Sequence, residues 1–247
     1  MLNIIKTINF LQKDLILLRS VKYSSAVTFN KLSTSILCTL NYSTSNNRDT
    51  VDAGEIERLN RLEWWDSNSA CRILQSFNPL RVQFVRDALS EDTKGKESLE
   101  AFADKKLLEV GCGGGIFSED HSAEFPNHYD AVVSSEVIEH VLDQDLFVKS
   151  CVDALKPGGR IVITAPSKTL LAKLHLIVLL EDIVKIIPKG LHEYDKFITP
   201  EALTHILERY NCKVERVRGR MYYPWSNKWK WVNYSTAYYV LQAVKLK

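Results

Sequence analysis

A run of glycines directly after an apolar segment is the feature that most constrains how this 247-residue chain folds. Residues 107–110 (LLEV) lead into Gly-Cys-Gly-Gly-Gly, which contains Gly111, Gly113 and Gly115. An apolar run that ends in glycines predicts a buried strand turning sharply towards a helix. Glycine lets the backbone approach a ligand closely, and a helix that begins there presents free N–H groups. The pattern indicates the nucleotide-binding corner of an open α/β sheet; a glycine-rich turn without a ligand is the alternative.

Composition narrows the class of protein further. A hydrophobic content of 45% supports a sizeable core, and a net charge of +2 with no large basic stripe argues against nucleic-acid binding. None of the five cysteines forms a CxxC pair, so neither a zinc ribbon nor a disulfide framework is indicated. Reduced thiols in an intracellular compartment are the simplest interpretation.

The first 47 residues differ from the rest of the chain. They carry five Lys or Arg among many Ser, Thr, Leu and Ile, and Asp14 is their only acid. This balance is typical of a mitochondrial transit peptide. A disordered tail or a local helix is the alternative, and we expect residues 1–47 to be disordered.

Residues 50–247 are predicted to form one domain with four parts. These are an N-terminal helical region (50–100), a core (105–165), an apolar lid or membrane-facing insertion (169–198), and a C-terminal helix with strands (199–247). Pro79 is predicted to lie at a helix start. Charges within residues 169–187 argue against a membrane span, and favour an amphipathic helix on a membrane or over an apolar pocket. An ordinary packed helix is the alternative.

Two acids and a histidine follow the strand predicted at residues 130–134. Glu136 lies three residues before Glu139 and four before His140, which places all three on one face of a helix start. Two carboxylates and an imidazole suit a divalent ion, with oxygen-rich ligation favouring Mg²⁺ and Zn²⁺ as the second choice. The alternative is an acidic helix N-terminus with His140 simply packed. His192 is a further candidate base.

Several motifs together resemble a known family. Residues 108–115 (LEVGCGGG), 130–133 (DAVV) and 155–159 (LKPGG) resemble the class I S-adenosylmethionine-dependent methyltransferases. Within that class, four further motifs look like the ubiquinone-biosynthesis O-methyltransferase family in its mitochondrial form: residues 64–66 (WWD), 78–81 (NPLR), 135–141 (SEVIEHV) and 196–198 (KFI).

The resemblance implies methyl transfer from S-adenosylmethionine to a hydroxyl of a polyprenylated catechol or quinol, with magnesium at the metal site. It implies a complex of ubiquinone-biosynthesis proteins on the matrix side of the mitochondrial inner membrane. Matched residue by residue, it assigns cofactor contacts to Arg81, Gly111, Gly113, Gly115 and Ser135, with Arg81 on the cofactor's carboxylate. His140 and His192 are the catalytic candidates, and the metal set is Glu136, Glu139 and His140.

One departure from the family pattern affects both fold and chemistry. After Glu119 the chain runs almost directly to Asp130, so a βα unit of about 40 residues is missing by typical unit lengths. Asp130 lies about 20 residues after the glycines, where a ribose-binding acid is expected, but it begins its strand and so lies at the wrong end of the sheet.

We therefore predict a Rossmann-like sheet of about five strands with residues 107–110 at its edge, and weak or no cofactor binding. The alternatives are a catalytically impaired variant that acts at most by binding to the complex, and a different small-molecule methyltransferase.

Overall fold

The computed structural model describes residues 72–90, 105–110 and 127–247. The predicted transit peptide, the Trp64–Trp65 region, Gly111, Gly113, Gly115 and the junction at Glu119 lie outside these ranges. The division of the chain into parts stays a prediction.

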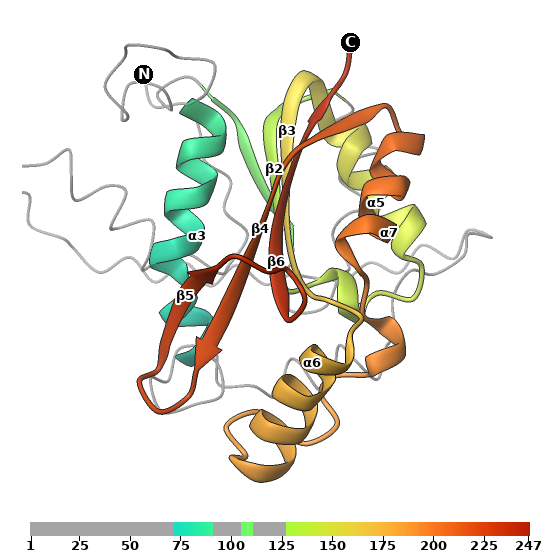
Figure 1. Cartoon of the computed structure of the whole chain (residues 1–247). Helices are drawn as coiled ribbons and strands as arrows, with labels where there is room; N and C mark the ends of the chain where they lie inside the picture. Colours follow the sequence, from blue (N-terminus) through green and yellow to red (C-terminus); the bar gives the residue numbers. More distant parts are fainter. Residues whose placement is uncertain (1–71, 91–104, 111–126) are drawn as a thin grey trace, which may run out of the picture.

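A six-stranded mixed sheet forms the centre of the molecule (Figure 1). Its strand order is β1-β2-β3-β6-β4-β5, with β1–β3 parallel and the remaining pairs antiparallel. The strands are β1 (Leu107–Val110), β2 (Tyr129–Ser135), β3 (Leu155–Pro166), β4 (Cys212–Tyr223), β5 (Lys228–Val232) and β6 (Tyr238–Lys245). The expected α/β fold with β1 at an edge is confirmed for the described strands, and β5 adds one strand to the five expected.

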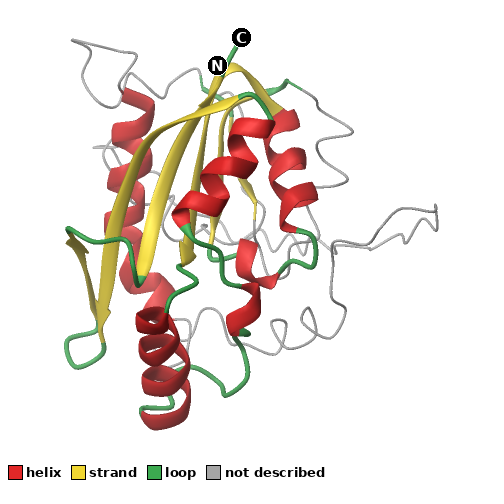
Figure 2. Ribbon diagram, turned by 45° about the vertical axis from the view of Figure 1, so that its right-hand side comes forward, coloured by secondary structure: helices red, strands yellow, loops and turns green. Residues whose placement is uncertain are grey.

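Helices cover both faces of the sheet, as the two ribbon views show (Figures 1 and 2). On one face lie α5 (Gln144–Ala154) and α7 (Pro200–Arg209), and on the other lies α3 (Arg72–Ser90). Short segments complete the described elements: the 3₁₀ turns η2 (Ile138–His140) and η4 (Tyr194–Lys196), and α6 (Leu170–Ala172) continued by the π-helix η3 (Lys173–Ile183). In the described ranges, no helix is both long and apolar enough to cross a membrane.

Side-chain caps and a well-placed proline explain where α5 and α7 begin. The Asp143 carboxylate accepts the Leu146 N–H at 2.9 Å, and the Thr199 hydroxyl accepts the Ala202 N–H at 3.2 Å. Pro200 follows as the first residue of α7, where its missing N–H costs nothing. Thr199 and Pro200 together thus define the start of α7.

The prediction for Pro79 is wrong. Pro79 lies inside α3, which begins at Arg72, instead of at a helix start. The apolar stripe of α3 continues across the proline: Phe77 and Phe84 are both buried against the sheet. Burying that stripe outweighs the roughly 3 kcal/mol that an interior proline costs a helix.

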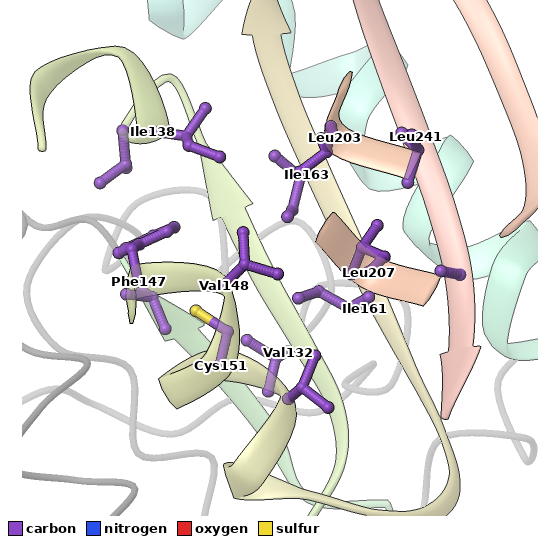
Figure 3. Close-up of a cluster of buried hydrophobic side chains, with 14 of the residues drawn as sticks. Val132, Ile138, Phe147, Val148, Cys151, Ile161, Ile163, Leu203, Leu207 and Leu241 are labelled. Carbon is purple, nitrogen blue, oxygen red and sulfur yellow. The ribbon is translucent and has the colours of Figure 1, made fainter. Parts of the chain in front are cut away.

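The core beneath α5 and α7 holds the parallel strands in place. Phe147, Val148 and Cys151 of α5 pack towards Val132 and Ile161 of the sheet (Figure 3). Leu203 and Leu207 of α7 extend this cluster over β3 and β6.

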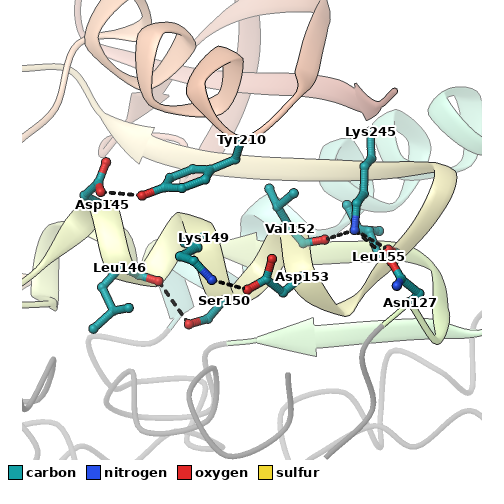
Figure 4. Close-up of polar contacts among 10 residues, drawn as sticks. All are labelled: Asn127, Asp145, Leu146, Lys149, Ser150, Val152, Asp153, Leu155, Tyr210 and Lys245. Carbon is teal, nitrogen blue, oxygen red and sulfur yellow. Dashed lines mark hydrogen bonds and ion pairs between the residues drawn. The ribbon is translucent and has the colours of Figure 1, made fainter. Parts of the chain in front are cut away.

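Polar contacts at the border of this core join α5 to its neighbours (Figure 4). The Tyr210 hydroxyl donates to Asp145 at 2.5 Å, and Lys245 of β6 donates to the carbonyls of Val152 and Leu155 at 2.9 Å each. These contacts attach α5 to the segment after α7, to β6 and to the amino end of β3.

Candidate active site

The turn that follows β2 is fixed against β3. The Glu136 N–H donates to the Thr164 carbonyl at 3.1 Å, and the Ser135 and Thr164 hydroxyls lie 3.0 Å apart. Glu136 takes the left-handed conformation, with φ of 56°. The expected helix start is instead this irregular residue followed by the short turn η2, so Glu136 does not share a helical face with Glu139 and His140.

Three side chains come together beside this turn. One ligand atom each of Glu139, His140 and His192 lies within 4.8 Å of the other two, and the rings of the two histidines are 5.3 Å apart. Glu139 is only 2% exposed. A carboxylate and two imidazoles at this spacing form a donor set that suits a divalent metal ion.

Gln144 connects the two chain segments that supply this group. Its side-chain amide donates to the Ile138 carbonyl in η2 at 3.0 Å and to the Lys196 carbonyl in η4 at 2.5 Å. Because η2 contains His140 and η4 begins two residues after His192, Gln144 holds the two histidine-bearing segments together.

Glu136, one of the three residues expected to bind a metal ion, lies apart from Glu139 and His140 in the structure. The Glu136 carboxylate accepts hydrogen bonds from Arg220 and from the Thr164 hydroxyl, the latter at 2.5 Å, and it is not part of the three-residue group. His192 takes its place there. Glu136 lies apart because Arg220 is buried and requires a negative partner.

Arg220 of β4 is 0% exposed and lies between aromatic rings. Its guanidinium carbon is 4.2 Å from the centre of the Phe77 ring and 4.4 Å from that of Trp229. Burial lowers the pKa of Arg220, and the charge of Glu136 acts in the opposite direction. Sequence reasoning did not single out this residue; its place in an otherwise buried stretch of β4 was the only signal.

Glu181 of η3 is the second functional candidate that sequence reasoning missed. Its carboxylate accepts from the His192 ring Nδ1 at 2.7 Å and from the Gly190 N–H at 2.8 Å. An acid in the middle of an apolar helical segment was the available signal. His192, expected as a base, therefore lies between Glu181 of η3 on one side and Glu139 and His140 on the other.

The described cofactor candidates lie at the carboxyl ends of the parallel strands. An Arg81 Nη1 lies 3.4 Å from Oε1 of Glu109, two residues before Gly111, and the other Nη also contacts Asn78. Ser135 is the last residue of the neighbouring strand β2. Both thus lie at the edge where open α/β sheets bind ligands.

Asp130 lies at the opposite, amino end of the sheet, as expected. It accepts the Lys106 N–H at 2.8 Å and pairs with the Lys156 ammonium at 2.8 Å. Burial raises the pKa of Asp130, but the hydrogen bond from the Lys106 N–H and the contact with Lys156 outweigh it, so the pKa is lowered overall. The placement gives Asp130 a role in the sheet and none at the cofactor corner.

Residues 118–217 match the family model described as a methyltransferase domain. The fold and the site at the carboxyl ends of the strands thus define a methyltransferase.

The curated relatives specify the family. The human mitochondrial ubiquinone biosynthesis O-methyltransferase is 34% identical, covering 83% of this chain and 67% of the human protein. The rat protein of the same name is 33% identical over 83% of this chain and 72% of its own length. The ubiquinone biosynthesis O-methyltransferase of Pelagibacter ubique is 27% identical over 80% of this chain and 99% of its own length. The chain belongs to the ubiquinone biosynthesis O-methyltransferase family, which confirms the expected class of S-adenosylmethionine-dependent methyltransferase.

The comparison with the human protein also bears on the missing segment. The alignment with the human protein has 250 positions, but it includes only about 205 residues of this chain, which is 83% of 247. About 45 positions of the alignment therefore have no counterpart in this chain. This agrees with the segment of about 40 residues expected to be missing from the spacing of the motifs.

Proposed function

We propose that this chain is built to transfer the methyl group of S-adenosylmethionine to a hydroxyl of a polyprenylated catechol or quinol intermediate in ubiquinone biosynthesis. The observation that carries the proposal is the group formed by Glu139, His140 and His192 beside the end of β2. It supplies the charge and basic nitrogen that a phenol-type acceptor requires, at the edge of the sheet where a cofactor binds. The names of the relatives support the assignment to ubiquinone biosynthesis.

The acceptor must lose a proton before or during methyl transfer. A phenol has a pKa near 10, so a base or a cation must favour the phenolate at neutral pH. Glu139, His140 and His192 would hold a divalent cation, which when bound would stabilise the phenolate oxygen by its charge. The surrounding residues would align this oxygen with the sulfonium methyl group and exclude water.

The donor set bears on the choice of cation. The resemblance implies Mg²⁺, which prefers oxygen ligands in octahedral geometry. Two imidazoles and one carboxylate suit Zn²⁺ or another transition metal better, and leave one position open for the substrate. We therefore propose a divalent cation here and expect Zn²⁺ or Co²⁺ to bind more tightly than Mg²⁺.

For the location we propose the matrix side of the mitochondrial inner membrane, in contact with other ubiquinone-biosynthesis proteins. The relatives named mitochondrial and the transit-like residues 1–47 support the compartment. Leu170, Leu174 and Ile183 are exposed on α6 and η3, and apolar side chains on one short segment favour contact with a membrane surface. No nucleic-acid partner is proposed.

One observation favours a second candidate, a catalytically impaired member of the family that acts by binding to the complex. About 45 positions of the alignment with the human protein have no counterpart in this chain. In addition, β1 forms an edge of the described sheet although its Leu108 and Val110 side chains are buried. An apolar parallel strand at an edge is prone to pair with other chains, and the ribose-binding acid has no counterpart.

Two measurements separate these candidates. Calorimetric titration of the chain with S-adenosylmethionine should show weak or no binding, and turnover of a demethylated quinone precursor should be absent, if the impaired form is correct. Micromolar binding with turnover would establish the active enzyme. Sequencing the transcript across the codons for Phe117 to Glu124 would show whether the missing segment belongs to the expressed protein.

A further inference from the structure

We propose that Glu181 is a positioning residue that orients His192 towards Glu139 and His140, so that the cation site depends on the apolar segment η3. The inference rests on the proposed function in one respect, because it takes the three-residue group as a cation site. The effect of Glu181 on the ring of His192 can be measured without a cation.

The contacts of Glu181 fix both the ring and the backbone of His192. Oε1 lies 2.7 Å from the ring Nδ1 and accepts the His192 backbone N–H at 3.1 Å. Oε2 accepts the Gly190 N–H at 2.8 Å. The Glu181 side chain is 1% exposed, so it makes these contacts with almost no competition from water.

These hydrogen bonds also decide which nitrogen of His192 is available. An ionised carboxylate only accepts hydrogen bonds, so Nδ1 must carry the proton in this contact. In the neutral ring the lone pair then belongs to Nε2. Nε2 is thus the nitrogen that can bind a cation together with Glu139 and His140. One ligand atom from each of the three residues lies within 4.8 Å of the other two. A carboxylate that holds a metal-binding histidine in this way is a general feature of metal sites.

The form of η3 supports a functional role over a purely structural one. Residues Lys173–Ile183 form a π-helix, and at its end the Val184 N–H donates to the Leu179 carbonyl at 2.8 Å. π-Helical turns are rare and are concentrated at functional sites. η3 otherwise buries apolar residues such as Leu176 and Leu180. A buried carboxylate among them is costly unless it is paired, and its partner here is the candidate ligand.

The test compares Glu181→Gln with Asp182→Asn. Asp182 is the next residue of the same helix and pairs with Lys189 on the surface at 2.9 Å, so D182N makes the same charge change without touching His192. Co²⁺ alone is the probe, titrated into the full chain by calorimetry and by its visible absorption. We expect E181Q to weaken Co²⁺ binding about 10- to 100-fold, and D182N to change it less than twofold.

A double variant checks that the effect acts through His192. His192→Gln should weaken Co²⁺ binding at least as much as E181Q, and E181Q combined with H192Q should show no further loss. A full additive loss in the double variant would mean that Glu181 acts elsewhere. Co²⁺ binding by E181Q equal to that of the unaltered chain would overturn the inference.

The tautomer of His192 provides a readout that needs no cation, and in the unaltered chain it can be measured even if E181Q does not fold. Ring ¹⁵N shifts of the unaltered chain should show the Nδ1-protonated form, and E181Q should shift His192 towards the Nε2-protonated form. Predominant Nε2 protonation in the unaltered chain would overturn the inference. An unaltered chain with the Nδ1 form but no Co²⁺ binding would instead overturn the proposed cation site and leave the orienting role of Glu181 standing.

Discussion

The buried pair of Glu136 and Arg220 allows a sharp prediction for Glu136→Gln. Arg220 is 0% exposed, and Glu136 is the only carboxylate that hydrogen-bonds to its guanidinium among the described residues. E136Q removes that negative charge and keeps a carbonyl oxygen at nearly the same place. The guanidinium stays charged because Arg is effectively always protonated, so in the buried site it loses the carboxylate that hydrogen-bonds to it and keeps only the more distant charge of Glu139.

The expected loss follows from the energetics of buried pairs. Removing one partner of such a pair costs about 3–5 kcal/mol, because an uncompensated charge remains inside the protein. The rings of Phe77 and Trp229, 4.2 and 4.4 Å away, still stabilise the cation in the variant. The glutamine carbonyl keeps one hydrogen bond as well, so we place the loss at the lower end, about 3 kcal/mol.

Urea unfolding followed by circular dichroism measures this loss. With a slope of about 3 kcal/mol per molar urea, the midpoint of E136Q should fall by about 1 M. The exposed pair of Lys149 and Asp153 (Figure 4) supplies a matched control, and Asp153→Asn should cost less than about 1 kcal/mol. Combining E136Q with Arg220→Met should recover most of the stability, because a well-packed apolar residue replaces a buried pair at little cost.

One result would refute this reasoning and restore the metal set expected from the sequence. If E136Q keeps the urea midpoint of the unaltered chain but loses divalent-cation binding, Glu136 is a ligand and its contact with Arg220 is not what holds the structure together.

Three further predictions concern stability. Pro79→Ala should raise the free energy of unfolding by about 1–3 kcal/mol, because Pro79 is exposed inside α3 and alanine restores a helix N–H without loss of packing. A fall in the midpoint of thermal unfolding would contradict this prediction. Gly219→Ala should destabilise by more than about 2 kcal/mol, since an added Cβ would meet the Tyr234 carbonyl oxygen at 1.6 Å; a variant with unchanged urea midpoint would argue against this close approach. Asp130→Asn should cost up to about 1 kcal/mol at pH 7, because Asp130 is partly exposed beside Lys156. Since the pKa of Asp130 is lowered on folding, that stabilisation is complete above its usual value of 3.8 and is lost as the pH falls through the lower folded value. A difference between D130N and the unaltered chain that does not shrink as the pH falls below 3.8 would contradict it.

The parallel part of the sheet could be predicted from the sequence because buried parallel strands are continuous apolar runs. β2 contains such a run at residues 131–133 and β3 at residues 161–165, but β3 begins earlier than this pattern predicts because it includes the Pro-Gly-Gly sequence at residues 157–159. β5 could not be predicted in the same way, because Lys228–Val232 alternates lysine with tryptophan and becomes a strand only by pairing with β4. Its Trp229 side chain then donates to the Ile73 carbonyl of α3 at 2.9 Å, a contact that no local pattern indicates.

Part of the candidate site was equally out of reach. Glu139 and His140 could be found because they follow a predicted strand at the edge where ligands bind. His192 could be named as a candidate base, but not as a neighbour of His140, because Gln144 and Glu181 bring the two segments together across long stretches of chain. Gly111, Gly113 and Gly115 lie outside the described residues, so their predicted contact with the cofactor stays a prediction.

The two acids after β2 show why spacing alone misled. Residues three apart share a face only if the backbone between them is helical, and Glu136 at φ of 56° is not. Its carboxylate therefore points towards Arg220 of β4, whereas Glu139 joins the two histidines. Moving one carboxylate out and one imidazole in changes the donor set from oxygen-rich to nitrogen-rich, and with it the class of cation that the site should prefer. The cation preference that we propose for this site thus depends on the dihedral angles of Glu136 and on a buried arginine 84 positions further along the chain.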